Sequence, residues 1–223
     1  MIRAYDLLIF DWDGTLSDSA ALIVGTMQQA ITGLGLPPRE DAQIRELIGL
    51  GLIEGLGLLY PDQDPLELQR VLGAYRKTWL QKVTVQEAPL FDGAAATIEA
   101  LHAAGYRISI ATGKSRAGLD RALRAEPDLA RWVELSRTAD ETASKPDPLM
   151  VREILLESGV PAQRALVIGD TEYDAAMAAG AGVAALGVAC GVHEPARIRA
   201  AGALDVIAMA SDLPDWLSAR SAA

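Results

Sequence analysis

The sequence has little cysteine and little positive charge, and both shortages exclude classes of protein. Cys190 is the single cysteine, so an intramolecular disulfide is impossible. The 20 Lys and Arg residues are outnumbered by 30 Asp and Glu, which gives a net charge of −10. A phosphate backbone is bound by a basic surface, so this charge argues against nucleic acid as the main partner. The first residues carry no secretory signal, and together with the single cysteine this predicts a cytoplasmic protein.

A long, strongly hydrophobic run is also missing. Residues 175–192 form 18 positions without a charge, which approaches the length of a membrane span. They are mostly alanine and glycine, and a short helix followed by a strand over 183–188 fits them better. We therefore expect no membrane partner. With 223 residues, half of them hydrophobic, the chain is long enough for one full-sized domain and a smaller one.

Two carboxylates follow the first apolar run of the chain. Leu7–Phe10 reads as a strand that is buried on both faces, and Asp11 and Asp13 come directly after it. Gly14 then allows the backbone to turn. In an open α/β sheet, ligands bind at the carboxyl ends of the strands. A carboxylate in this place can attack phosphorus, its neighbour can move the proton, and a magnesium ion would reduce their repulsion.

A second predicted strand, over 106–111, is followed by Thr112 and Gly113. A hydroxyl and backbone N–H groups at such a strand-to-helix turn form a nest for an anion. The tripeptide Gly-Lys-Ser at 113–115 also suggests a nucleotide-binding P-loop. That motif needs a glycine five residues before Gly113, where this chain has Ile108, so the P-loop interpretation fails.

Two later segments repeat the pattern of charged side chains beside apolar strands. Lys145 lies between Ser144 and a proline, where a fixed cation can stabilise a phosphoryl group. The apolar strand predicted at 165–168 is followed by Asp170 and Asp174. Carboxylate oxygens are the ligands that Mg²⁺ prefers, so these two acids are candidate metal ligands.

The chain carries four short motifs in the order DxDGTLxDS, TG, SKP and GDTxxD. They resemble motifs I to IV of the haloacid dehalogenase-like (HAD) phosphohydrolase superfamily. The resemblance implies that Asp11 is the nucleophile and that Asp13 is the general acid and base. It further implies that Thr112 and the Gly113 amide hold the phosphoryl oxygens, although many relatives have asparagine at the position of Gly113. Lys145 would be the catalytic cation. The implied cofactor is Mg²⁺, with Asp11, Asp13, Asp170 and Asp174 as the metal set.

The order of predicted elements gives the fold class. Helices alternate with strands after Pro89, which predicts a parallel sheet with helices on both faces. The segment 17–87 contains no buried strand, and the same superfamily has a subclass with a helical cap inserted at this place. We therefore expect an α/β Rossmann-like, doubly wound core from residues 1–16 and 88–223, with a cap domain at 17–87. The expected strands are 6–10, 106–111, 132–135, 165–168, 183–188 and 205–207, and the expected helices of the cap are 20–34, 39–48 and 66–83.

The chain looks like phosphoglycolate phosphatase-like members of that subclass, which implies a small phosphorylated metabolite as the substrate. Specificity in the subclass comes from the cap. We expect it to depend on the loop 48–52, with Gly49 and Gly51, and on nearby polar residues such as Arg45 and Arg76. The sequence carries no prediction of the oligomeric state.

Other interpretations of the same motifs differ in single residues. A dehalogenase would lack Asp13, and a non-catalytic binding module would be expected to lose at least one motif acid or Lys145. A sugar phosphomutase of the β-phosphoglucomutase type would carry a histidine in the helix after motif I, and 20–34 has none. The mutase and other capped hydrolases, such as a pyrophosphatase, stay as alternatives. Six residues separate Cys190 from Arg197, one more than the five in the Cys-x5-Arg loop of tyrosine phosphatases. His193 lies near Cys190, but two such side chains in a loop do not make a metal site.

Overall fold

The computed structural model describes residues 3–83 and 88–221, and its centre is a parallel sheet. The six strands lie in the order β3-β2-β1-β4-β5-β6, and all the pairs are parallel. Their bounds are Leu7–Phe10, Arg107–Thr112, Val133–Thr138, Ala165–Gly169, Ala184–Val188 and Val206–Ile207 for β1 to β6. Phe10 of β1 is in register with Ile110 on one side and Ile168 on the other. The residues that follow these three strands therefore meet at one edge of the sheet.

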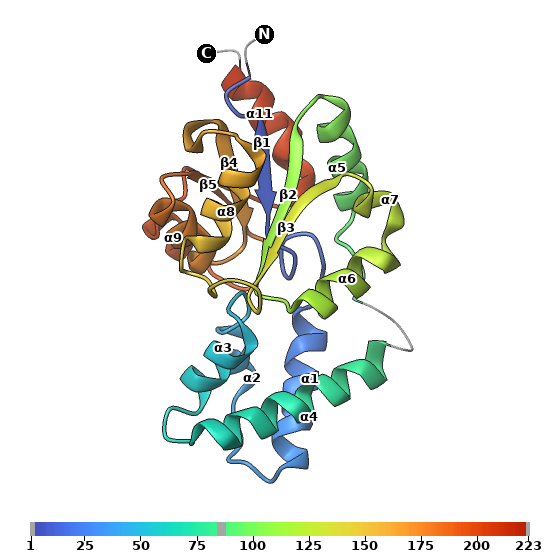
Figure 1. Cartoon of the computed structure of the whole chain (residues 1–223), viewed down its shortest axis with the longest axis vertical. Helices are drawn as coiled ribbons and strands as arrows, with labels where there is room; N and C mark the ends of the chain where they lie inside the picture. The colour runs from blue at the N-terminus through green and yellow to red at the C-terminus, as the bar shows by residue number, and fades with distance from the viewer. Residues whose placement is uncertain (1–2, 84–87, 222–223) are drawn as a thin grey trace.

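Helices cover both faces of the sheet, as predicted for a doubly wound fold (Figure 1). The helices that follow β1 to β6 outside the insertion described below are α5 (Ala94–Ala103), α6 (Arg116–Ala125), α7 (Pro127–Ala130), α8 (Leu149–Ser158), α9 (Glu172–Gly180), α10 (Pro195–Ala200) and α11 (Leu213–Ser221). Side chains alternate along β1, so Leu8 and Phe10 pack with α5 and α11, whereas Leu7 and Ile9 pack with α8 and α9. The predicted α/β Rossmann-like fold class is confirmed.

Four helices between β1 and β2 form a separate group at the carboxyl end of the sheet (Figure 1). We call α1 to α4 and their connections, residues 20–83, the helical insertion. The insertion has its own apolar core, in which Met27, Ile44, Leu56 and Leu72 are buried together. Its helices are α1 (Ala20–Gly33), α2 (Asp41–Arg45), α3 (Leu52–Leu59) and α4 (Pro65–Val83).

The insertion differs from expectation in two elements. The helix predicted over 39–48 is α-helical only over Asp41–Arg45, and α3 was not predicted. Gly55 and Gly57 weaken the helical signal of α3, because glycine is a poor helix former. Burial of Leu56 and Leu59 in the core of the insertion stabilises the helix nevertheless. Tertiary packing decided the structure of this segment.

The two chain connections of the insertion run side by side. Ser17, before α1, forms an antiparallel bridge with Leu90, which lies between α4 and α5. The Asp18 N–H donates to the Pro89 carbonyl at 2.9 Å, and the Phe91 N–H donates to the Leu16 carbonyl at 2.9 Å. Entry and exit of the insertion are thus held together by backbone hydrogen bonds.

No helix in the described part of the chain has the length and apolar character needed to cross a membrane. The uncharged run 175–192 is divided between α9 and β5, in agreement with the expectation of a helix and a strand.

Candidate active site

Asp11 lies directly after β1, and its side chain is almost completely buried. Its backbone N–H donates to the Ile168 carbonyl at 2.9 Å, which fixes the residue against β4. Lys145 Nζ is 2.8 Å from Asp11 Oδ1, yet neither carboxylate oxygen accepts a well-directed hydrogen bond from the described residues. Burial raises the pKa of Asp11 to about 7 against the opposing charge of Lys145, and the charge of Asp174 adds to the rise. This carboxylate has oxygen atoms available for another partner.

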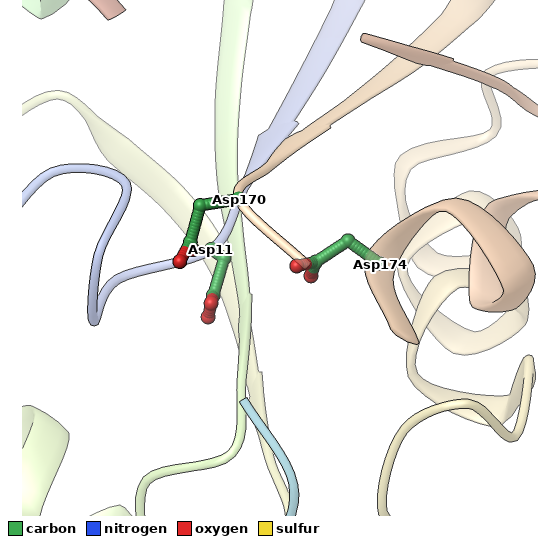
Figure 2. Close-up of side chains that lie close together, drawn as sticks. All are labelled: Asp11, Asp170 and Asp174. Carbon is green, nitrogen blue, oxygen red and sulfur yellow. The ribbon is translucent and has the colours of Figure 1, made fainter. Parts of the chain in front are cut away.

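Asp170 and Asp174 bring two further carboxylates to Asp11. One oxygen from each of the three residues lies within 4.8 Å of the others, and all three side chains are buried (Figure 2). Asp170 accepts hydrogen bonds of 2.9 Å from the Thr15 hydroxyl and from the Val192 N–H. Burial raises the pKa of Asp170 well above its usual value, and the negative charges of Asp11 and Asp174 raise it further. The cluster predicted from motifs I and IV is therefore present.

The chemistry of this cluster fits a divalent cation. Three buried carboxylates repel one another, and a cation with a preference for oxygen ligands would offset that repulsion. The oxygens of Asp11 accept no well-directed hydrogen bond from the described residues, so they can serve as ligand atoms. Asp11, Asp170 and Asp174 are the residues that would hold Mg²⁺.

Lys145 is buried between two of these acids. Its Nζ is 2.6 Å from Asp174 Oδ1 in addition to its contact with Asp11. Burial alone would lower the pKa of Lys145, but the two carboxylates outweigh it and the pKa is raised, so the side chain stays charged. Asp174 is held in turn by Thr171, whose hydroxyl donates to Asp174 Oδ2 at 2.6 Å at the start of α9.

Asp13 is held by partners other than the three-carboxylate cluster. The Ser19 hydroxyl donates to Asp13 Oδ1 at 2.6 Å, and Lys114 Nζ lies 2.7 and 2.9 Å from the two carboxylate oxygens. Ser19 directly precedes α1, but its hydroxyl makes no capping bond to that helix. Lys114 was not among the predicted site residues, although its position directly after Thr112 and Gly113 could have pointed to it. The role of Asp13 in the metal set stays a prediction.

Thr112 and Gly113 end β2 beside this group. Thr112 is buried, and its hydroxyl accepts a 3.3 Å hydrogen bond from the Lys114 N–H. A Cβ atom on Gly113 would lie 2.4 Å from the Leu50 carbonyl oxygen and 2.6 Å from that of Gly49. Glycine at this position therefore lets the loop of the helical insertion approach the backbone after β2. Any side chain at this position would require the loop to move.

The same loop is bound to the core at two more places. The Gly51 N–H donates at 2.6 Å to the hydroxyl of Ser144, the residue that directly precedes Lys145. On the other side, the Tyr173 hydroxyl donates to the Glu46 carbonyl at 3.0 Å, and Arg197 forms a 2.5 Å ion pair with the Glu46 carboxylate. These contacts hold the helical insertion over the carboxyl end of the sheet.

A cavity of about 690 Å³ separates the helical insertion from the core, and Asp11, Asp13 and Thr112 line it. Of the residues predicted to set specificity, Gly49, Gly51 and Arg76 also line this cavity. Arg45 is exposed at the end of α2 and is not among the residues that line the cavity. Its role in specificity stays a prediction.

Known proteins resemble this chain in both sequence and structure. A family model described as haloacid dehalogenase-like hydrolase matches residues 8–188. A protein of Dickeya dadantii named "Probable phosphatase IndB" is 34% identical, over 87% of this chain and 86% of its own length. A phosphoglycolate phosphatase of Rhodospirillum rubrum is 31% identical, over 94% and 90% of the two chains. The crystal structure of a hydrolase from Pseudomonas syringae superposes with a TM-score of 0.84 at 25% identity, and covers 96% of this chain and 98% of that one.

The family match includes all four motifs that carry the site, from Asp11 to Asp174. It confirms the predicted family, fold and class of enzyme. The chain belongs to the haloacid dehalogenase-like hydrolase family.

Proposed function

We propose that this hydrolase is a magnesium-dependent phosphatase that cleaves a small phosphomonoester through an aspartyl-phosphate on Asp11. The observation that carries the proposal is the Asp11 carboxylate. It is buried at the wall of a cavity and paired with Lys145, and its oxygens accept no well-directed hydrogen bond from the part of the chain that the structure describes. The phosphatase names of the relatives from D. dadantii and R. rubrum support the same reaction class. Phosphoglycolate is accordingly the first substrate to test.

In this proposal residues 17–87 act as a cap domain on a catalytic core built from residues 1–16 and 88–223. The support is the position of the helical insertion, whose loop contacts Gly113, Ser144 and Tyr173 beside the predicted site. A substrate in the cavity would be enclosed by both parts, which excludes bulk water from the reacting atoms.

The reaction would have two steps on this chain. The Asp11 carboxylate attacks phosphorus, the bond to the leaving oxygen breaks, and Asp13 gives that oxygen its proton. Asp13 then takes a proton from water, the resulting hydroxide attacks the aspartyl-phosphate, and free phosphate leaves with Asp11 restored. Ser19 and Lys114 fix the carboxylate of Asp13 for both transfers.

Positive charge at the site comes from two sources. Lys145 places its ammonium group beside Asp11, where it can stabilise the charge of the transferring phosphoryl group. Asp11, Asp170 and Asp174 would hold Mg²⁺, and Asp13 also belongs to the predicted set of ligands. When bound, the ion would reduce the negative charge on the phosphoryl oxygens. Thr112 and the Gly113 amide are the proposed ligands of those oxygens.

The alternative is a phosphomutase, which shares the aspartyl-phosphate but passes the phosphoryl group to a second hydroxyl of the sugar. No histidine lies in α1, and the two histidines of the chain contact other residues. His193 accepts the Glu172 N–H at 3.2 Å, and the ring of His102 stacks on Trp132. Because α1 offers no group that titrates near neutrality, water should react as soon as the leaving group departs.

Product analysis distinguishes these two functions. Purified enzyme with Mg²⁺ is expected to release phosphate from phosphoglycolate, or from another small phosphomonoester in a metabolite panel, in equal amount to the alcohol formed. Conversion of β-glucose 1-phosphate to glucose 6-phosphate with little free phosphate would show that the phosphatase assignment is wrong.

Asp13→Asn is expected to slow the chemical step more for poor leaving groups than for good ones. General acid–base assistance contributes about 10²–10⁴-fold, and p-nitrophenolate needs little protonation whereas an alkoxide needs it fully. The rate should therefore fall by about 10³-fold on an alkyl phosphate but far less on p-nitrophenyl phosphate. Steady-state kcat for both substrates measures this. Equal losses would mean that Asp13 positions the substrate and does not transfer a proton.

A further inference from the structure

The wall of the active-site cavity is made mostly of apolar side chains from the helical insertion. Helices α1, α3 and α4 all contribute side chains to this wall. Examples from these helices are Ile23, Met27, Ile53, Leu72 and Leu80. Leu80 is 51% exposed although it is a large apolar residue, so it marks the solvent side of the wall. Contiguous apolar surface inside a cavity indicates an apolar ligand group.

Charges on the same wall do not favour a second anionic group. Among the described residues that line the cavity, Lys114, Arg76 and Arg121 are cationic, whereas Asp11, Asp13, Glu54 and Asp140 are acidic. Lys114 is already paired with Asp13, and the side chain of Arg76 is exposed. A carboxylate such as that of glycolate, once enclosed here, would lose its hydration without a surplus of positive charge to replace it.

The aromatic part of the wall lies beside the proposed proton donor. Tyr75 and Trp79 of α4 stack with their ring centres 5.8 Å apart, and both line the cavity. Lys114 Nζ lies 5.2 Å from the centre of the Trp79 ring while it contacts the carboxylate of Asp13. A leaving oxygen at Asp13 therefore places the rest of the leaving group near Tyr75 and Trp79.

We propose that the substrate is a phosphomonoester whose leaving group is uncharged, largely apolar and several carbon atoms larger than glycolate. The proposal rests on the phosphatase function above and changes the substrate class from a small ester with two anionic groups to an ester with one charged end. The cavity of about 690 Å³ agrees with this, because cavities of about 300–1,000 Å³ hold ligands far larger than glycolate. In this arrangement the phosphate binds at the strand ends and the apolar group packs against the helical insertion.

A series of n-alkyl phosphates from ethyl to hexyl tests the proposal, because the leaving alcohols differ in apolar area but hardly in acidity. Each fully buried methylene contributes up to about fourfold in binding, so partial burial should raise kcat/KM at least about tenfold from ethyl to hexyl phosphate. Hexyl phosphate should also exceed phosphoglycolate. A flat or falling series, or a preference for phosphoglycolate over hexyl phosphate, would overturn the proposal.

Two leucines on α4 provide a matched pair of variants. Leu80 lines the cavity, whereas Leu66 is 73% exposed on the same helix and does not. Leu80→Gln is expected to lower kcat/KM for hexyl phosphate about threefold or more and to change ethyl phosphate less than twofold. Leu66→Gln should leave both values unchanged. Equal effects of the two variants on hexyl phosphate would count against the apolar wall as the binding surface.

Binding of phosphonates separates this proposal from the reaction itself, since they are not hydrolysed. With Mg²⁺ present, hexylphosphonate should raise the melting temperature more than ethylphosphonate does at equal concentration, whether or not the esters turn over. If no ester releases phosphate but hexylphosphonate binds better, the phosphatase function fails and the apolar site stands. If esters are cleaved but both phosphonates bind equally, the phosphatase function stands and the apolar site fails.

Discussion

Asp11→Asn should reduce phosphate release by at least about 10⁴-fold, the largest effect of any single substitution in this chain. A carboxamide is a very weak nucleophile, so the aspartyl-phosphate would not form, and loss of the group that makes the covalent bond typically costs several orders of magnitude. Steady-state rates on p-nitrophenyl phosphate measure the loss. A variant within tenfold of the wild type would exclude Asp11 as the nucleophile.

Two controls show whether the loss is chemical. Asp128→Asn changes the same group at an exposed position of α7 and should keep full activity. In metal-free buffer, Asp11→Asn should also melt at a higher temperature than the wild type at pH 8. The pKa of Asp11 rises from 3.8 to about 7 in the folded protein, so its charge destabilises the fold above pH 7. That gain should shrink as the pH falls from 7 towards 4 and disappear below 3.8, where the carboxyl becomes protonated in both states.

Removal of divalent metal should abolish turnover almost as completely, by at least about 10³-fold, with full recovery on addition of Mg²⁺. The three buried carboxylates leave a large uncompensated negative charge next to an incoming phosphate dianion, and Lys145 alone is already shared by Asp11 and Asp174. The measurement is activity after treatment with EDTA and gel filtration. Undiminished activity in the presence of EDTA would contradict a metal-dependent mechanism.

A substitution at Asp170 locates the metal within the cluster. Asp170→Asn should raise the Mg²⁺ concentration for half-maximal activity at least about tenfold, because it removes a charged oxygen ligand. Asp140→Asn is the matched control, since Asp140 lines the cavity but lies outside the carboxylate cluster. An equal Mg²⁺ requirement in Asp170→Asn and the wild type would remove Asp170 from the ligand set.

The strand ends of the core were predictable because the information is local. Leu7–Phe10 and Ala165–Gly169 are short apolar runs that stop at acids, and parallel pairing brings such stops to one edge whatever the intervening chain does. The sequence pattern therefore placed Asp11 beside Asp170, which are separated by more than 150 residues.

The remaining parts of the site depend on distances that no local pattern records. Lys114 reaches Asp13 across 101 residues, and its role follows from side-chain length and the turn after β2. Arg45 was placed at the substrate because it is polar and near the loop, but α2 ends there and leaves it exposed. The apolar wall is spread over three helices between Ile23 and Leu80, so it becomes a single surface only when those helices pack.

The paired connections at Ser17 and Leu90 have a consequence for how this enzyme can be altered. Since the two ends are already joined by backbone hydrogen bonds, the chain between them can change length and content without moving β1 away from β2. Under the proposed division into core and cap, catalysis and substrate recognition would belong to separate modules that meet at this one junction. Transplanting another set of helices at residues 18 and 89 should give a chimaera that keeps the same chemistry and acquires a new repertoire of substrates.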